Sequence, residues 1–114
     1  MQYHVLYNPL AGNGKGESAA RALANDLPAD SFTFEDVTAI TDFAAFFAAL
    51  PADRKVVIAG GDGTLNRFIN DTADVTLPEE VYYYATGSGN DFLNDLEKKP
   101  GGKPILLTPY LKSL

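Results

Sequence analysis

The sequence predicts an α/β fold in which a parallel sheet carries helices on both faces. Short apolar segments typical of strands alternate along the chain with segments whose apolar residues repeat at helical spacing. One strand segment, residues 56–59, is apolar at every position, as in a strand covered on both faces of a parallel sheet. With 114 residues, 46% hydrophobic and 21% charged, the chain has the size and composition of one globular domain.

The first part of the chain predicts a strand, a loop and a helix. Residues 3–7 are apolar and aromatic, as expected for a strand, and a loop follows over residues 8–16. The next apolar residues recur at intervals of three and four, which predicts one face of a helix that ends at Pro28. These residues are Ala20, Leu23, Ala24 and Leu27.

The same alternation continues with a second strand and a second helix. We expect the strand over residues 31–37, with Phe32 and Phe34 on one side. Either Thr41 or Asp42 can cap the helix, which stops at the next proline. Its apolar stripe is expected to pack in the core and consists of Phe43, Phe46, Phe47 and Leu50.

The second half of the chain predicts three more strands and two more helices. Three consecutive tyrosines in the fourth strand are expected to serve in packing. In chain order, the expected elements are a strand at 56–59, a loop at 60–64, a helix at 65–72, a strand at 81–85, a loop at 87–89, a short helix at 91–96 and a strand at 104–108.

Composition and charge exclude several classes of protein. With no cysteine, the chain has no disulfides and no thiolate metal site. A net charge of −6 argues against nucleic acid as a partner. The N-terminus has no signal-peptide pattern, and no apolar run approaches the roughly 20 residues that span a bilayer, so we expect a cytoplasmic protein whose membrane contact is at most peripheral.

Residues 98–114 carry four lysines and no acid, and form either a solvated tail or a patch for phosphate or anionic lipid.

Three loops that follow predicted strands are rich in glycine. They lie at residues 8–16, 60–64 and 87–91. Because right-handed crossovers bring the C-terminal ends of parallel strands to one edge, we expect the loops to meet there. Glycine lets a ligand approach the backbone, and the amides that open the following helix attract phosphate. The pattern therefore predicts a crevice that binds a nucleotide.

The first loop matches neither of two well-known phosphate motifs. The Walker A pattern G-x-x-x-x-G-K-[ST] is absent, although Lys15 can either neutralise phosphate or remain solvated. The glycines follow G-x-G-x-G instead of the dinucleotide pattern G-x-G-x-x-G, with Glu35 and Asp36 about 20 residues further on. A fragment of a dinucleotide-binding oxidoreductase thus stays an alternative, but it leaves the other two loops unexplained.

The string GGDGTLN at residues 60–66 is similar to the signature of the diacylglycerol kinase catalytic domain. Sphingosine, ceramide and bacterial lipid kinases share this domain. The resemblance extends to NPxxG at residues 8–12 and GSGNDF at residues 87–92, in the family's order, and it covers roughly the whole chain. It implies an NAD kinase-like fold, akin to that of phosphofructokinase, and transfer of the ATP γ-phosphoryl group to a lipid hydroxyl such as that of diacylglycerol.

The resemblance also implies a role for each motif residue. Residues 8–12 would touch the nucleotide, and Thr38 is the match to a family threonine near it. Residues 60–66 would cradle the phosphates, Asp62 would join a network of water and Mg²⁺, and Ser88 would contact ATP. The expected nucleotide-binding set is Asn8, Pro9, Leu10, Ala11, Gly12, Thr38, Gly60, Gly61, Asp62, Gly63, Thr64, Leu65, Asn66 and Ser88.

The chain departs from the family's pattern in three respects. The family often has Ser where Ala11 stands and Glu where Arg67 stands; we expect little effect of Arg67, which lies away from the apolar stripe. Residues 1–114 would form a truncated ATP-binding domain, because family members continue into a second, mostly β domain. That domain would supply the catalytic base and most of the site for the lipid alcohol, so we assign no catalytic residue here. The sequence leaves homodimerisation open.

Simpler interpretations stand beside these roles. Asp62 and Gly63 form a common turn pair, and Asn8 with Pro9 can be a strand-ending turn. Residues 90–91 can simply cap the short helix. His4 is expected to be packed or on the surface and not catalytic. As whole functions, the alternatives are an NAD kinase-like enzyme and a nucleotide-binding module without catalysis.

Overall fold

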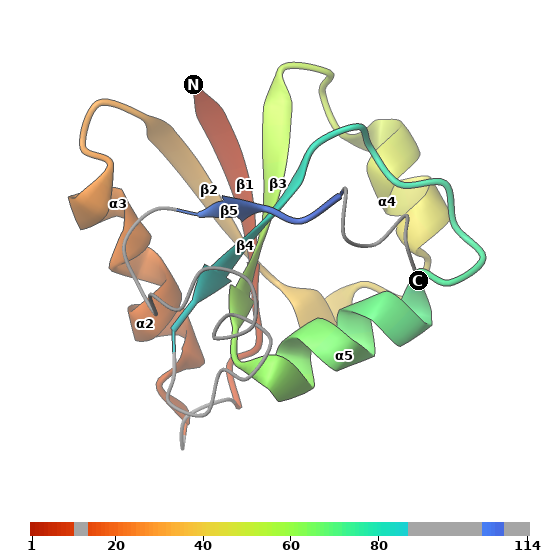
Figure 1. Ribbon diagram of the computed structural model, residues 1–114, viewed down its shortest axis with the longest axis horizontal. Coiled ribbons are helices and arrows are strands. Elements are labelled where there is room, and N and C mark those ends of the chain that lie inside the picture. The colour runs from red at the N-terminus through yellow and green to blue at the C-terminus, as the bar shows by residue number, and fades with distance from the viewer. Residues whose placement is uncertain (11–13, 87–103, 109–114) are drawn as a thin grey trace.

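The protein forms a five-stranded sheet with helices on both faces, as seen in a computed structural model that describes residues 1–10, 14–86 and 104–108 (Figure 1). The sheet has the order β2-β1-β3-β4-β5. The first four strands are parallel, which confirms the predicted fold class. The strands are β1 (Gln2–Tyr7), β2 (Ser31–Asp36), β3 (Arg54–Gly60), β4 (Val81–Ala85) and β5 (Ile105–Leu106).

The last strand differs from the expectation of a wholly parallel sheet. It is two residues long and runs antiparallel to β4, with Tyr82 opposite Leu106. An antiparallel strand needs no helical crossover back to the start of its neighbour. The Thr108 hydroxyl accepts a hydrogen bond from the Val81 amide at 2.7 Å, which fixes the end of this strand against β4.

One face of the sheet is covered by α2 (Gly16–Arg21) and α3 (Leu23–Asp26), on the left in Figure 1. The two helices form the predicted helical segment, interrupted at Ala22 and finished before Pro28. Phe32 and Phe34 pack on this side, as expected. The buried residues of this half of the core are Val5, Ala20, Leu23, Val57, Ala59 and Tyr84.

The other face carries η1 (Val37–Ala39), α4 (Phe43–Ala49) and α5 (Asp62–Asp71). Asp42, and not Thr41, caps α4: its carboxylate accepts a hydrogen bond from the Ala45 amide at 3.0 Å. The phenylalanine stripe of α4 packs in the core as predicted, with the Phe43 and Phe68 rings edge to face at 5.6 Å. The loop predicted over residues 60–64 is shorter than expected, since residues 62–64 form the first turn of α5.

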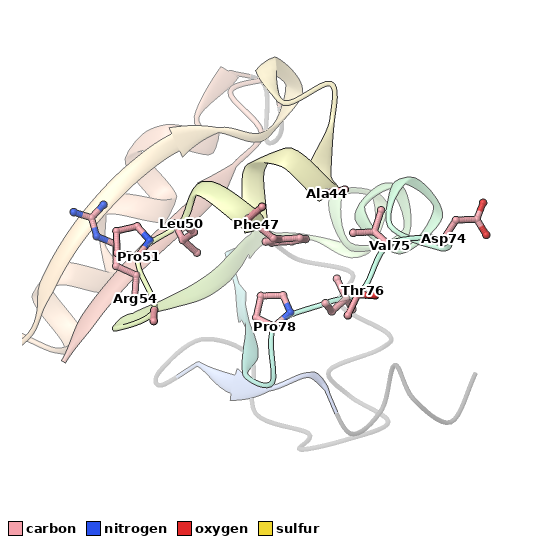
Figure 2. Close-up of a pocket in the computed structure, with 12 residues that line it drawn as sticks. Ala44, Phe47, Leu50, Pro51, Arg54, Asp74, Val75, Thr76 and Pro78 are labelled. Atoms are coloured by element: carbon pink, nitrogen blue, oxygen red, sulfur yellow. The ribbon is translucent and has the colours of Figure 1, made fainter.

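A groove of about 620 Å³ lies on this side, between α4 and residues 74–78 (Figure 2). Arg54 and Asp74 lie at its opposite ends. Because Arg54 begins β3, the groove lies at the N-terminal ends of the strands, away from the glycine-bearing loops. Its apolar lining includes Phe47, Leu50, Pro51, Val75, Leu77 and Pro78.

Within the described residues, no helix combines the length and the hydropathy needed to cross a bilayer. The third glycine-rich loop and the short helix at 91–96 lie outside the described part of the chain.

Candidate functional site

The four parallel strands end level with one another. Tyr7 pairs with Asp36 on one side and with Ala59 on the other, and Ala59 pairs in turn with Tyr84. The residues that follow this row therefore leave the sheet along a single edge, which lies in the lower part of Figure 1 beside the start of α5. Of the three glycine-rich loops that the sequence predicted to meet, those at residues 8–16 and 60–64 leave this edge in their described parts, whereas the loop at 87–91 lies outside the described residues.

The order of the strands places a topological switch point at this rim between β1 and β3. From β1 the chain passes to β2 on one side of it, and from β2 it crosses to β3 on the other side. The helix that follows β1 packs on one face and the helix that follows β3 packs on the opposite face. Ligands of open α/β sheets bind where the connections diverge in this way. Asn8 and Gly61 lie on the two sides of this point.

The loop after β1 is held close to the start of α2. The Asn8 side-chain oxygen accepts a hydrogen bond from the Leu10 amide at 2.9 Å, forming a turn within the loop. A Cβ at Gly16 would lie 1.8 Å from the Asn8 carbonyl oxygen, so only glycine fits at this position. Pro9 is half-buried, whereas Leu10 is 80% exposed. Ala11 and Gly12 lie outside the described residues.

Several residues of the GGDGTLN string support the loop instead of facing solvent. A Cβ at Gly60 would lie 2.7 Å from the Thr64 side chain, which is itself buried. The Gly60 carbonyl accepts hydrogen bonds from the Tyr83 hydroxyl at 3.1 Å and from the Thr86 amide at 3.2 Å. Leu65 is in the core, and its amide donates to the Gly61 carbonyl at 3.1 Å. The side chain of Leu65 is thus unavailable to a ligand.

The first turn of α5 begins directly after Gly61 at this switch point and carries polar groups. Its amides, including those of Gly63 and Thr64, have no carbonyl partner within the helix, and they carry the positive end of the helix dipole. Gly63 is exposed, and nothing in the described part of the chain lies within 4 Å of where its Cβ would be. Asn66 is also exposed.

The carboxylate of Asp62 stands at the same turn and acts on its surroundings through its charge. Burial, and to a lesser extent the negative charge of Asp62, raise the pKa of Tyr83 to about 12. The Tyr83 hydroxyl therefore stays protonated and keeps its hydrogen bond to the Gly60 carbonyl. From the first turn of α5, the charge of Asp62 thus acts on Tyr83, a buried residue of the core.

Thr38 lies at the end of β2, in η1. Its amide and its hydroxyl both donate to the Asp36 carboxylate, at 2.8 and 2.6 Å. The neighbouring Val37 meets Asn8 and Thr64 around a cavity of about 10 Å³, room for about one water molecule. The ends of β1 and β2 and the start of α5 are thus in contact. Ser88, which the resemblance to the kinase family predicts to contact ATP, lies outside the described residues.

Arg67 and Asp71 also line this small cavity. They share one face of α5 with Thr64, at intervals of three and four residues. The sequence predicted that Arg67 lies away from the apolar stripe of its helix, and its side chain is indeed exposed. The sequence gave no sign that this face of α5 lies beside the ends of β1 and β2. Gly16 was equally hidden, because its partner is a backbone carbonyl eight residues away.

His4 lies outside the site, as expected for a packed histidine. Its Nε2 is 2.7 Å from a carboxylate oxygen of Glu35 on the neighbouring strand, and its ring is buried.

Among the described residues, a divalent cation could be held by one carboxylate together with phosphates of a ligand, and not by a cluster of three protein side chains. No three His, Cys, Asp or Glu side chains among them are grouped to bind a metal ion. Mg²⁺, however, keeps several waters and is usually held by one or two carboxylates together with substrate phosphates. A single carboxylate, Asp62, beside amides that attract phosphate matches that mode.

Comparisons with known proteins agree with this geometry. The profile of the diacylglycerol kinase catalytic domain family matches residues 2–108. A solved structure of a proposed diacylglycerol kinase from Bacillus anthracis str. Sterne is similar, with a TM-score of 0.54 and 21% sequence identity. The match covers 83% of this chain and 35% of that protein, so it shows the shared fold over part of a longer chain. No curated protein matches significantly.

Proposed function

This chain belongs to the diacylglycerol kinase catalytic domain family, and from this premise we propose that it is the ATP-binding part of a lipid kinase. The family places the chain among the kinases. In the proposed reaction, the bond between the γ-phosphorus of ATP and its bridging oxygen breaks, and a new bond forms to the oxygen of a lipid hydroxyl such as that of diacylglycerol. The hydroxyl proton passes to a base that we assign to a second, mostly β domain.

The observation that carries the proposal is the glycine at position 63. In a helix, glycine is less favourable than alanine by about 1 kcal/mol. Gly63 has no positive φ and no neighbour that a Cβ would meet among the described residues, so the fold does not require it. Gly16 and Gly60, in contrast, are explained by packing. A bare Cα at an exposed helix start is what close approach of a phosphate requires.

The roles of the other residues follow from their positions. Asn8 and the amides of the first turn of α5 would receive the phosphate chain from opposite sides of the switch point. Bound Mg²⁺ would neutralise phosphate charge, with Asp62 holding waters of its coordination shell. Phosphoryl transfer depends mainly on such positioning and charge stabilisation. The fragment would therefore hold ATP but lack the base, and we expect it to bind nucleotide weakly and to phosphorylate no lipid.

The proposal is tested by calorimetric titration of the chain with Mg²⁺ and ATP, comparing wild type with Gly63→Ala. We expect Gly63→Ala to fold, to gain up to about 1 kcal/mol of stability, and yet to bind at least about tenfold more weakly, because a new methyl group blocks a phosphate. Asn70→Ala, an exposed change further along the same helix, is the matched control and should bind like wild type.

Two results would contradict the proposal. One is a folded wild-type chain that does not bind ATP; the other is a Gly63→Ala variant with unchanged affinity. A parallel titration with NAD and NADH separates the dinucleotide-binding alternatives, since binding of these without ATP would favour them. Robust phosphorylation of diacylglycerol by residues 1–114 alone would contradict the division of labour between the two domains.

A further inference from the structure

The side chain of Arg67 occupies a position at the rim that the proposed function does not use. It lines the small cavity together with Asn8 at the end of β1 and Val37 at the end of β2. Arg67 is one turn along α5 from Thr64, on the face of the helix turned toward these strand ends. The cavity itself is too small for a phosphate, so any ligand that Arg67 contacts lies outside it, along the exposed rim.

The guanidinium group of Arg67 is available for a ligand. Its side chain is 62% exposed, and Nε lies 3.7 Å from the Asp71 carboxylate. That distance is too long for a hydrogen bond, and an exposed ion pair of this kind contributes little to stability. Arg21 gives the contrast, because its Nε is only 2.8 Å from the Glu17 carboxylate.

The acidic side chains near Arg67 would repel a triphosphate, and the positive charge of Arg67 would offset that repulsion. The chain carries a net charge of −6, and Asp36, Asp62 and Asp71 all lie near the ends of β2 and β3 or on α5. A triphosphate must approach this rim against like charge. A planar guanidinium is suited to the task, because its donors match two phosphate oxygens at once.

We propose that Arg67 binds the phosphate chain of the nucleotide, so that this site selects a nucleoside triphosphate over the unphosphorylated nucleoside. The inference rests on the proposed function and adds to it a contact from the second turn of α5. Arg67 then draws the phosphates toward the end of β1, while the amides of the first turn of α5 hold them from the other side.

The experiment compares four chains by calorimetric titration, with Mg²⁺ and ATP in one series and adenosine in the other. The chains are wild type, Arg67→Gln, Arg67→Lys and Arg21→Gln. We expect Arg67→Gln to weaken ATP binding about tenfold and to leave adenosine binding unchanged. Arg67→Lys should fall between the two, because it keeps the charge and loses the planar group. Arg21→Gln, which also removes an exposed arginine with an acid one turn away, should match wild type.

Salt supplies a second readout. The dependence of ATP affinity on salt should be weaker in Arg67→Gln than in wild type, because one contact between charges is gone. Wild-type ATP affinity in Arg67→Gln, or an equal loss for adenosine and ATP, overturns the inference and leaves the proposed function standing. A wild-type chain that does not bind ATP removes both. Thermal melting of each variant confirms that it is folded.

Discussion

Replacing Gly16 with alanine tests the most tightly packed contact at the rim. The new Cβ would lie 1.8 Å from the Asn8 carbonyl oxygen and 2.8 Å from its carbonyl carbon. Since Cβ atoms essentially never approach another heavy atom within 3.0 Å, the first contact must lengthen by at least 1.2 Å. Both sides of the contact are backbone, so no side-chain rotation relieves it, and either α2 or the Asn8 turn must move.

The expected cost follows from comparable overpacked sites. We expect the free energy of unfolding of Gly16→Ala to fall by about 2 to 3 kcal/mol, which lowers the melting temperature by about 10 to 20 °C in a domain of this size. Urea denaturation followed by circular dichroism measures the first quantity, and thermal melting measures the second. The displaced Asn8 should also weaken ATP binding.

Two other glycines separate the packing effect from other effects of alanine. Gly14 has a φ of 86° and open space around its Cβ position, so Gly14→Ala should cost only about 1 kcal/mol of backbone strain. Gly63→Ala meets neither obstacle and should not destabilise the fold. If Gly16→Ala were as stable as Gly14→Ala, the structure would be absorbing the clash at no cost, and the argument for a rigid contact would be refuted.

Two more substitutions test the core and a helix cap. Tyr83→Phe should lower the free energy of unfolding by about 1 kcal/mol at neutral pH, because a hydrogen bond is lost. Folding raises the pKa of Tyr83 to about 12. The stability that the Tyr83 hydroxyl contributes is therefore fully present below pH 10 and is lost as the pH rises toward 12. Urea titrations at pH 8 and 11 should thus show a smaller loss in Tyr83→Phe than in wild type, and equal losses would count against the raised pKa. Asp42→Ala should cost about 1 kcal/mol through the lost cap of α4. The neighbouring Thr41→Ala should cost almost nothing in the same measurement, and the reverse order would show that the cap was assigned to the wrong residue.

The order of the helices and strands was predictable because most of them show a characteristic spacing of apolar residues in the sequence. The fully apolar strand at 56–59 and the phenylalanine stripe of α4 needed no tertiary information. The start of α5 was harder, since residues 62–64 are polar or glycine and show no apolar repeat, although they form a helical turn. The direction of β5 was also hidden, because a two-residue strand takes its direction from hydrogen bonds to β4 and not from its own pattern.

The glycine-bearing loops were predicted to converge, but the sequence did not show which glycines serve the fold and which face outward. Gly16 and Gly60 are explained by atoms that only the folded chain brings near: the Asn8 carbonyl and the Thr64 side chain. Gly63 differs from both, because no described atom lies within 4 Å of the position that its Cβ would take. The position of Arg67 beside Asn8 likewise depends on where α5 lies against the sheet, which no local pattern specifies.

The position of β1 in the interior of the sheet has a consequence for how the molecule folds. The strand β1 is flanked by β2 on one side and by β3 on the other, in parallel register. Its residues therefore cannot complete their hydrogen bonds until the chain has been made as far as Gly60, and such distant pairings form slowly. We therefore expect the rim that carries Asn8 and Gly61 to form late in folding, when β1 and β3 pair.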